Sequence, residues 1–145
     1  MTALVAATTL VQATQAVTAH LTAHPLPEPA VLEVMICLGR PEVRAQMRSH
    51  TVAGLTIELL AWADTLSAIT IQAWRIPTGD QVQLSITSTL TGPTGPVALY
   101  VYGGASEDPM PFADLALGER HPLTVGELRR LAAGDPVATR GGELA

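Results

Sequence analysis

The sequence predicts one α+β domain in which helices cover one face of a mainly antiparallel sheet of about five strands. Its 145 residues, 48% of them hydrophobic and 14% charged, suffice for one core and exclude disorder over most of the chain. Apolar residues recur at helical spacing in two long stretches and alternate with polar ones in several shorter stretches. Tight turns join the alternating stretches, which favours antiparallel pairing. We expect this domain over residues 1–134 and a frayed tail over 135–145.

Two long helices are expected in the first half of the chain. Residues 2–23 repeat apolar side chains every three or four positions and carry no charged side chain, so their outer face suits contact with a partner. The second helix starts at Ser49 or Thr51 and runs to Leu66, with the most regular apolar stripe in the sequence. Gly54, in its first turns, is expected to allow a close approach to the sheet.

Five segments have the alternation or the β-branched and aromatic content of strands: residues 31–38, 42–48, 68–76, 81–90 and 96–102. The first two are expected to form a hairpin through a turn at Gly39–Pro41, and a helix over residues 41–49 is the alternative. Turns at residues 77–80 and 92–95 join the last three strands. The glycine pair at 103–104 is expected to end the sheet.

The segment after the sheet, residues 105–122, holds three prolines and is expected to be an irregular loop anchored by Phe112 and Leu115. Thr124 stands three positions before a glutamate, which is the spacing of a capping box. This spacing predicts a short helix over residues 124–133.

The face of the sheet opposite the helices is the candidate site. Strand alternation assigns to it Met35, Arg44, Gln46, Arg48, Gln72, Trp74, Gln83, Ser85, Tyr100 and Tyr102. We select seven of these as binding residues: Arg44, Gln46, Arg48, Trp74, Gln83, Tyr100 and Tyr102. The guanidinium groups of Arg44 and Arg48 are expected to converge. Arginine beside aromatic rings is typical of protein interfaces and of platforms for single-stranded nucleic acid, whereas an ordinary hydrated outer face is the alternative.

The motifs of known catalytic and metal sites do not emerge from the sequence. His20 and His24 have metal-ligand spacing on one helix face, but Leu21 stands where a helical zinc-protease motif has glutamate. There is no G-x-S-x-G elbow, P-loop or G-x-G-x-x-G, and Cys37 is expected to be an inert residue on a strand. We therefore predict no catalytic residue, no metal ligand and no cofactor.

Charge and composition narrow the class of partner. The formal net charge of −5 disfavours broad nucleic-acid binding, which requires many cations. No apolar run reaches the roughly 18–20 residues of a membrane-spanning helix, and no basic residue precedes Arg40, as a signal peptide would require. The single cysteine cannot form an intrachain disulfide, so nothing in the sequence requires an oxidising compartment. These features predict a cytoplasmic protein that does not bind membranes.

Three further segments resemble those of a known group of proteins. They are Leu59–Leu66, then Ala73–Arg75 followed by the turn Pro77–Asp80, and Val101–Gly104. With these segments, residues 20–105 resemble a group of small uncharacterised proteins of high-GC actinomycetes and their mobile elements. The resemblance implies provenance, and it assigns no catalytic residue.

The sequence thus predicts a non-catalytic interaction or accessory domain. Such a domain is expected to self-associate, or to bind a protein, through the polar and aromatic sheet face, an edge strand or the uncharged first helix. A ligand-binding domain or enzyme with a pocket between sheet and helices is the alternative, with His50, Arg75 or His121 as polar groups. An accessory protein associated with nucleic acid is a second alternative.

Overall fold

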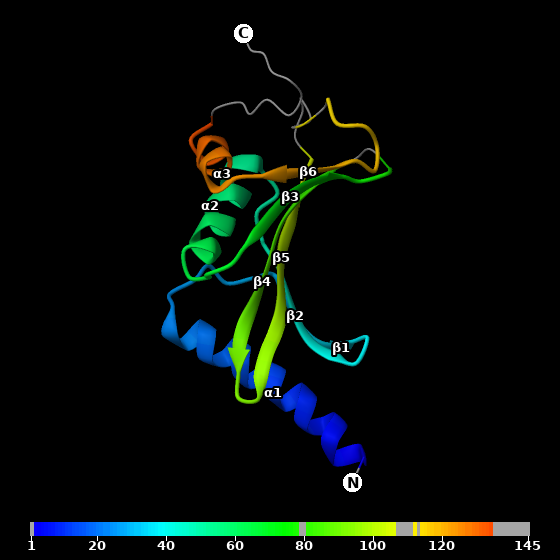
Figure 1. Ribbon diagram of the computed structural model, residues 1–145. Helices are drawn as coiled ribbons and strands as arrows, with labels where there is room; N and C mark the ends of the chain where they lie inside the picture. Colours follow the sequence, from blue (N-terminus) through cyan, green and yellow to red (C-terminus); the bar gives the residue numbers. More distant parts are fainter. Residues whose placement is uncertain (1, 79–80, 107–111, 113, 135–145) are drawn as a thin grey trace.

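The computed structural model describes residues 2–78, 81–106, 112 and 114–134, with the backbone alone for residues 2–8. The three helices are α1 (Thr2–Ala23), α2 (Val52–Ala63) and α3 (Val125–Ala132). The strands are β1 (Val31–Cys37), β2 (Arg40–Gln46), β3 (Thr70–Arg75), β4 (Val82–Gly92), β5 (Gly95–Ala105) and β6 (Arg120–Leu123). The chain is an α+β domain, as predicted (Figure 1).

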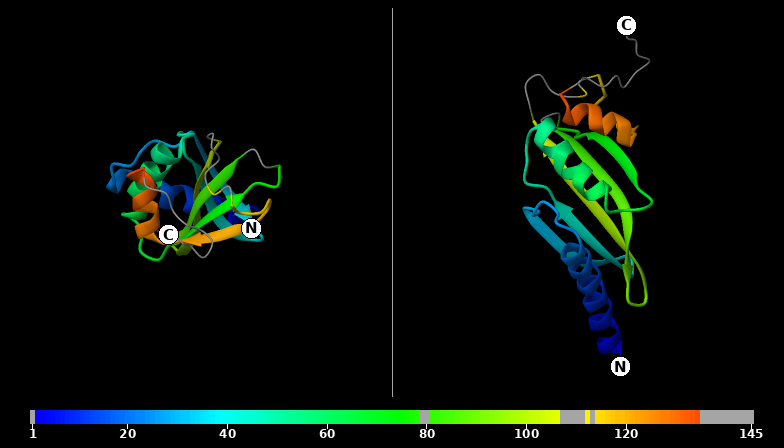
Figure 2. Two further views of the ribbon diagram at one scale, coloured as in Figure 1. Left: turned by 90° about the horizontal axis from the view of Figure 1, so that it is seen from above. Right: turned by 90° about the vertical axis from the view of Figure 1, so that its left-hand side faces the viewer.

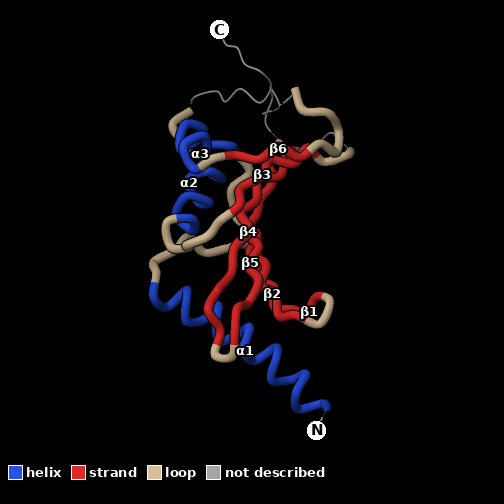
Figure 3. The backbone as a smooth tube through the Cα atoms, viewed as in Figure 1, coloured by secondary structure: helices blue, strands red, loops and turns tan. Residues whose placement is uncertain are grey.

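The strands form one sheet in the order β1-β2-β5-β4-β3-β6 (Figure 3). Four of its five pairings are antiparallel, and the fifth, between β2 and β5, is parallel. The sheet has six strands instead of the five expected, because Arg120–Leu123, which overlaps the end of the predicted loop, pairs with β3. The parallel pairing of β2 with β5 joins the first hairpin to the later strands.

The helices cover one face of the sheet, as predicted (Figure 2). α1 contacts β1, β2 and β4, α2 contacts β4 and β5, and α3 packs on α2. Trp62 and Leu59 of α2 are fully buried in the same core as strand residues such as Leu84. Val17 of α1 belongs to the same core. Within the part of the chain that the structure describes, this one-sided arrangement leaves the other face of the sheet without a helix.

The first hairpin turns earlier than predicted. Leu38 and Gly39, with φ angles of 52° and 78°, form a two-residue turn between Cys37 and Arg40. Such turns match the twist of the flanking strands, so Arg40 joins β2. The prediction of a turn at Gly39–Pro41 was wrong, and so was the helical alternative over β2. β2 ends at Gln46, which leaves Arg48 outside the sheet.

Several boundaries also differ from the predictions. β5 continues through Gly103 to Ala105, because the missing side chain at Gly103 makes room for Leu55 of α2. α2 starts after its N-cap Thr51 and ends at Ala63, three residues before the expected end. Phe112 and Leu115 are buried as anchors, and the capping box of α3 is present. The tail predicted over 135–145 lies outside the described residues.

Candidate functional site

Six of the seven candidate residues lie on the open face of the sheet. Strand pairing places Arg44 level with Tyr100 and Gln46 level with Tyr102. Trp74 lies level with Gln83 on the neighbouring pair of strands. All six side chains are partly exposed, while the alternate residues of the same strands are buried beneath the helices. We call these six residues the open-face site: Arg44, Gln46, Trp74, Gln83, Tyr100 and Tyr102.

Arg48, the seventh candidate, lies away from this site. β2 ends before Arg48, and its guanidinium Nη1 pairs with the Glu28 carboxylate at 3.2 Å in the connection after α1. Arg44 pairs instead with Glu42, two positions earlier on the same strand. The hydrogen bond and charge of Glu42 raise the pKa of the Arg44 guanidinium. The predicted convergence of Arg44 and Arg48 was therefore wrong, because each arginine has its own carboxylate.

Two tyrosines form the centre of the open-face site. The rings of Tyr100 and Tyr102 stack with centroids 5.1 Å apart. Gln83 Nε2 donates a hydrogen bond of 2.6 Å to the Tyr100 hydroxyl oxygen, which fixes that ring along the strands. Burial, followed by the charge of Glu33, raises the pKa of Tyr102. The stacked pair is thus an aromatic surface in which a hydrogen bond from Gln83 holds one ring in place.

Trp74 is held by an arginine that the sequence did not identify. The guanidinium carbon of Arg120 lies 4.3 Å from the centre of the Trp74 ring, and the two residues are level across the β3–β6 pair. Arg120 Nη1 also donates to the Gln72 amide oxygen at 3.3 Å. Arg120 was missed because its segment was expected to be a loop. Glu42 was missed as well, although its spacing from Arg44 on one strand face predicts the contact.

A hollow of about 340 Å³ lies beside Tyr100 on the open face. Its lining combines one ion pair with small and aromatic surfaces from three strands: Glu42, Arg44, Thr87, Ala98, Leu99 and Tyr100. A side chain of moderate size from another molecule would fit this hollow and would contact the Arg44 guanidinium and the Tyr100 ring. This geometry suits recognition of another surface, because an ion pair and an aromatic ring lie side by side in the lining.

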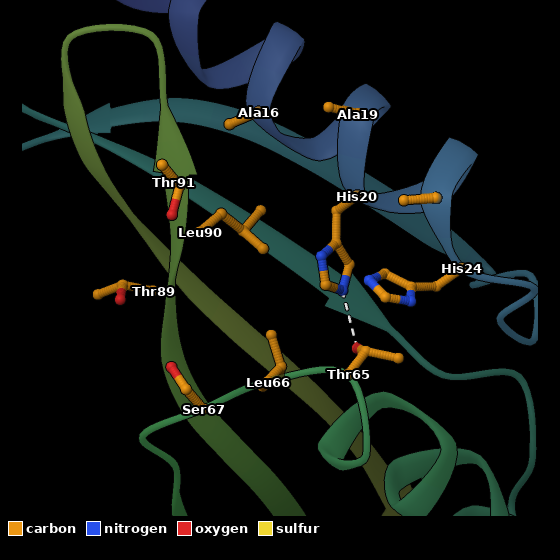
Figure 4. Close-up of a pocket in the computed structure, with 11 residues that line it drawn as sticks. Ala16, Ala19, His20, His24, Thr65, Leu66, Ser67, Thr89, Leu90 and Thr91 are labelled. Carbon is orange, nitrogen blue, oxygen red and sulfur yellow. Dashed lines mark hydrogen bonds between the residues drawn. The ribbon is translucent and has the colours of Figure 1, made fainter.

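A second hollow of about 340 Å³ lies on the helix side, between α1, β4 and the segment after α2 (Figure 4). The imidazoles of His20 and His24 point into it, with ring centroids 4.7 Å apart. Thr65 Oγ1 donates to the Trp62 carbonyl at 2.7 Å, so it accepts from His20 Nε2 at 2.8 Å. His20 Nε2 therefore carries the proton, and the neutral ring keeps a lone pair on Nδ1.

The surroundings of His20 in this second hollow favour its neutral form. Burial, and then the nearby His24, lower the pKa of His20. Thr65 was missed in the sequence because its contact with His20 spans 45 positions. None of the described lining residues is a carboxylate, and the described part of the chain holds no group of three potential metal ligands.

The polar groups expected for a pocket between sheet and helices do not line this hollow. Arg75 donates from Nη1 to the Leu115 carbonyl at 2.9 Å and so anchors the segment before β6. His121 lies on β6, level with Ala73, and His50 is exposed before α2. Cys37 is a free, partly exposed thiol at the end of β1.

Comparison with known proteins finds no matching family model, no matching curated protein and no matching solved structure. The resemblance of residues 20–105 to actinomycete proteins therefore stays a prediction. The class of protein defined here is an α+β domain with an open, aromatic sheet face.

Proposed function

We propose that this chain is a non-catalytic interaction domain that binds a protein partner through the open-face site. The observation that carries the proposal is the stacked Tyr100–Tyr102 pair beside the hollow at Arg44. Interface residues that dominate binding are enriched in tyrosine, tryptophan and arginine, and they surround pockets that a partner side chain fills. A cytoplasmic location belongs to the same proposal and rests on the single cysteine.

The order of the site supports binding without large rearrangement. Gln83 holds Tyr100, Glu42 holds Arg44, and Arg120 holds Trp74. Side chains that are already fixed lose less conformational freedom when a partner arrives. The open-face site is thus prepared for contact before any partner binds.

The test compares Y100A with a matched truncation on the helix side, I57A. Ile57 is 57% exposed on α2, so I57A also removes an exposed apolar side chain but leaves the open face intact. We expect Y100A to weaken partner binding by about 2 kcal/mol, or roughly 30-fold in Kd, as for a central interface residue. I57A should bind like the wild type.

The measurement starts with proteins captured from a lysate of the source cells and ends with calorimetry on the purified partner. Circular dichroism of both variants checks that the fold is unchanged. Partners that bind Y100A and W74A as tightly as the wild type would remove the open face from the function.

A small-ligand site is the second candidate, because the hollow at His20 and His24 lies between helices and sheet, where such sites occur. Binding of a metabolite that H24A abolishes and Y100A leaves intact would favour it. The nucleic-acid alternative has less support, since Arg44 and Arg48 are both engaged with carboxylates. Binding of single-stranded DNA at low salt, lost in R44A, is the result that would revive it.

A further inference from the structure

The outer edge of β1 is an end of the sheet that no described strand pairs with. β1 is the first strand in the sheet order and pairs only with β2 among the described strands. Sheet edges in native proteins usually carry charges, proline or a bulge that prevent pairing with another chain. β1 has no proline and one charged residue, Glu33, while Leu32 and Ile36 are 39% and 41% exposed. This edge therefore presents both backbone groups and apolar side chains.

The hydrogen bonds of β2 show which backbone groups of β1 face outward. Met47 N donates to the Tyr102 carbonyl at 2.7 Å, and Ala30 N donates to the Gln46 carbonyl at 2.8 Å. Successive residues of a strand direct their backbone groups to opposite sides. The backbone groups of Gln46 and of every second residue of β2 before it therefore point toward β1. The residues of β1 that pair with them all have odd numbers. The even residues of β1 direct their N–H and C=O groups outward, and they are Leu32, Val34 and Ile36.

The sequence of β1 is complementary to itself in one antiparallel register. A two-fold axis at Val34 pairs all seven residues of the strand with those of a second copy. Leu32 then lies opposite Ile36 of the partner subunit, and Glu33 lies opposite Met35 of the partner subunit.

Both neighbouring registers are worse. An axis at Glu33 would place two carboxylates opposite each other, which is unfavourable in a sheet. An axis at Met35 would require Leu38 as a strand residue, although Leu38 adopts the turn conformation with a φ of 52°.

We propose that a second copy of this chain pairs antiparallel with β1 about a two-fold axis at Val34, so that two six-stranded sheets become one. The axis is perpendicular to the sheet, because residues that lie opposite each other in an antiparallel pair direct their side chains to the same face of the sheet. Both helix layers then lie on one side, and both open-face sites lie on the other. The dimer does not depend on the proposed function, since none of the six open-face residues takes part in the pairing.

The first experiment uses the native thiol of Cys37 and the variant V31C. In the proposed register, Val31 lies opposite Cys37 of the partner subunit as a pair without direct hydrogen bonds, at a Cα separation of about 4.5 Å. That separation suits a disulfide. Mild oxidation of V31C should therefore give a covalent dimer with two symmetric disulfides and no free thiol.

Two controls accompany the oxidation of V31C. L32C places the new thiol on the other face of the strand, so it should stay monomeric on a non-reducing gel. The wild type should also stay monomeric on that gel, because its two Cys37 thiols would lie six residues apart along the joined strands, about 20 Å.

The second experiment uses V34P in sedimentation equilibrium. Proline removes one outward N–H at the centre of the interface and leaves the hydrogen bonds to β2 in place. Wild type and V34T should show a monomer–dimer equilibrium, and V34P should be a folded monomer by circular dichroism. A wild type that is monomeric at every concentration overturns the proposal. A wild type that dimerises also overturns it if oxidation crosslinks V31C no faster than L32C. Y100A should dimerise normally, which separates this result from the test of the open-face site.

Discussion

His20 shows how a single side chain can couple the stability of the fold to pH. Its Nε2 proton is committed to Thr65, its ring stacks near Trp62 with centroids 6.0 Å apart, and His24 lies beside it. Burial and the neighbouring imidazole lower the pKa of His20. The folded chain therefore binds this proton more weakly than the unfolded chain does.

We predict that stability falls as pH drops below the ordinary histidine pKa of about 6.5, because the unfolded chain then takes up a proton that folded His20 resists. This loss continues down to the lowered pKa of the folded state. H20Q keeps an N–H donor for Thr65 without the titration, so its free energy of unfolding should change less between about pH 7.5 and about pH 5. Urea unfolding at both pH values measures the difference. H50Q, at an exposed position, is the control and should retain the wild-type dependence on pH.

At the scale of the elements, a glycine determines how closely α2 approaches the sheet. A Cβ at Gly103 would lie 2.5 Å from Leu55 Cδ1 and 3.4 Å from Met47 Cβ. Leu55 is fully buried and cannot move aside easily. Gly54, where the sequence predicted this contact, instead faces Ser49 Oγ, at 2.0 Å from the corresponding Cβ position. The close approach therefore depends on a strand glycine that was expected to end the sheet.

We predict that G103A destabilises the fold by about 1–3 kcal/mol, the usual cost of an added methyl group in a packed core. G126A is the matched control. A Cβ there would meet only Thr124 Oγ1 at 3.8 Å on the exposed side of α3, so this variant should be stabilised by up to about 1 kcal/mol. Urea titrations of both variants give the free energies. A G103A variant as stable as the wild type would mean that α2 adjusts its packing.

How far an element was predictable depended on whether its signal was local. The alternation around Leu84 predicted β4, and the spacing of Thr124 and Glu127 predicted the cap of α3. β6 has no such alternation and becomes a strand only because β3 supplies its partners. Arg120 was absent from the predicted site because β6 was not predicted as a strand. Tyr100 and Tyr102 were identified because side chains of their strand alternate between the two faces of the sheet. Pairings between distant segments, such as His20 with Thr65, leave no trace in local spacing.

At the scale of the whole molecule, the parallel pairing of β2 with β5 makes one unit from two hairpin-containing segments. The register places Val43 level with Leu99, so buried residues of the first hairpin meet those of the later strands. α1 adds Ala13 and Val17 to the same core as Trp62. Because the core is shared, neither segment can keep its packing when the other unfolds. The prediction of one domain over residues 1–134 therefore implies that the domain unfolds cooperatively.

We predict a single unfolding transition, seen identically by two probes. The chain has two tryptophans, and W74F leaves Trp62, which is fully buried on α2, as the only one. Its fluorescence reports the α2 side of the core, while far-ultraviolet circular dichroism reports all helices and strands, including β1 and α1. In W74F the two signals should have the same urea midpoint and slope, as two-state unfolding requires. If circular dichroism is lost at a lower urea concentration than the change in Trp62 fluorescence, α1 and the first hairpin unfold separately from α2. V17A, which removes α1 packing, should shift both midpoints together, because a truncation in a shared core destabilises every element that packs against it.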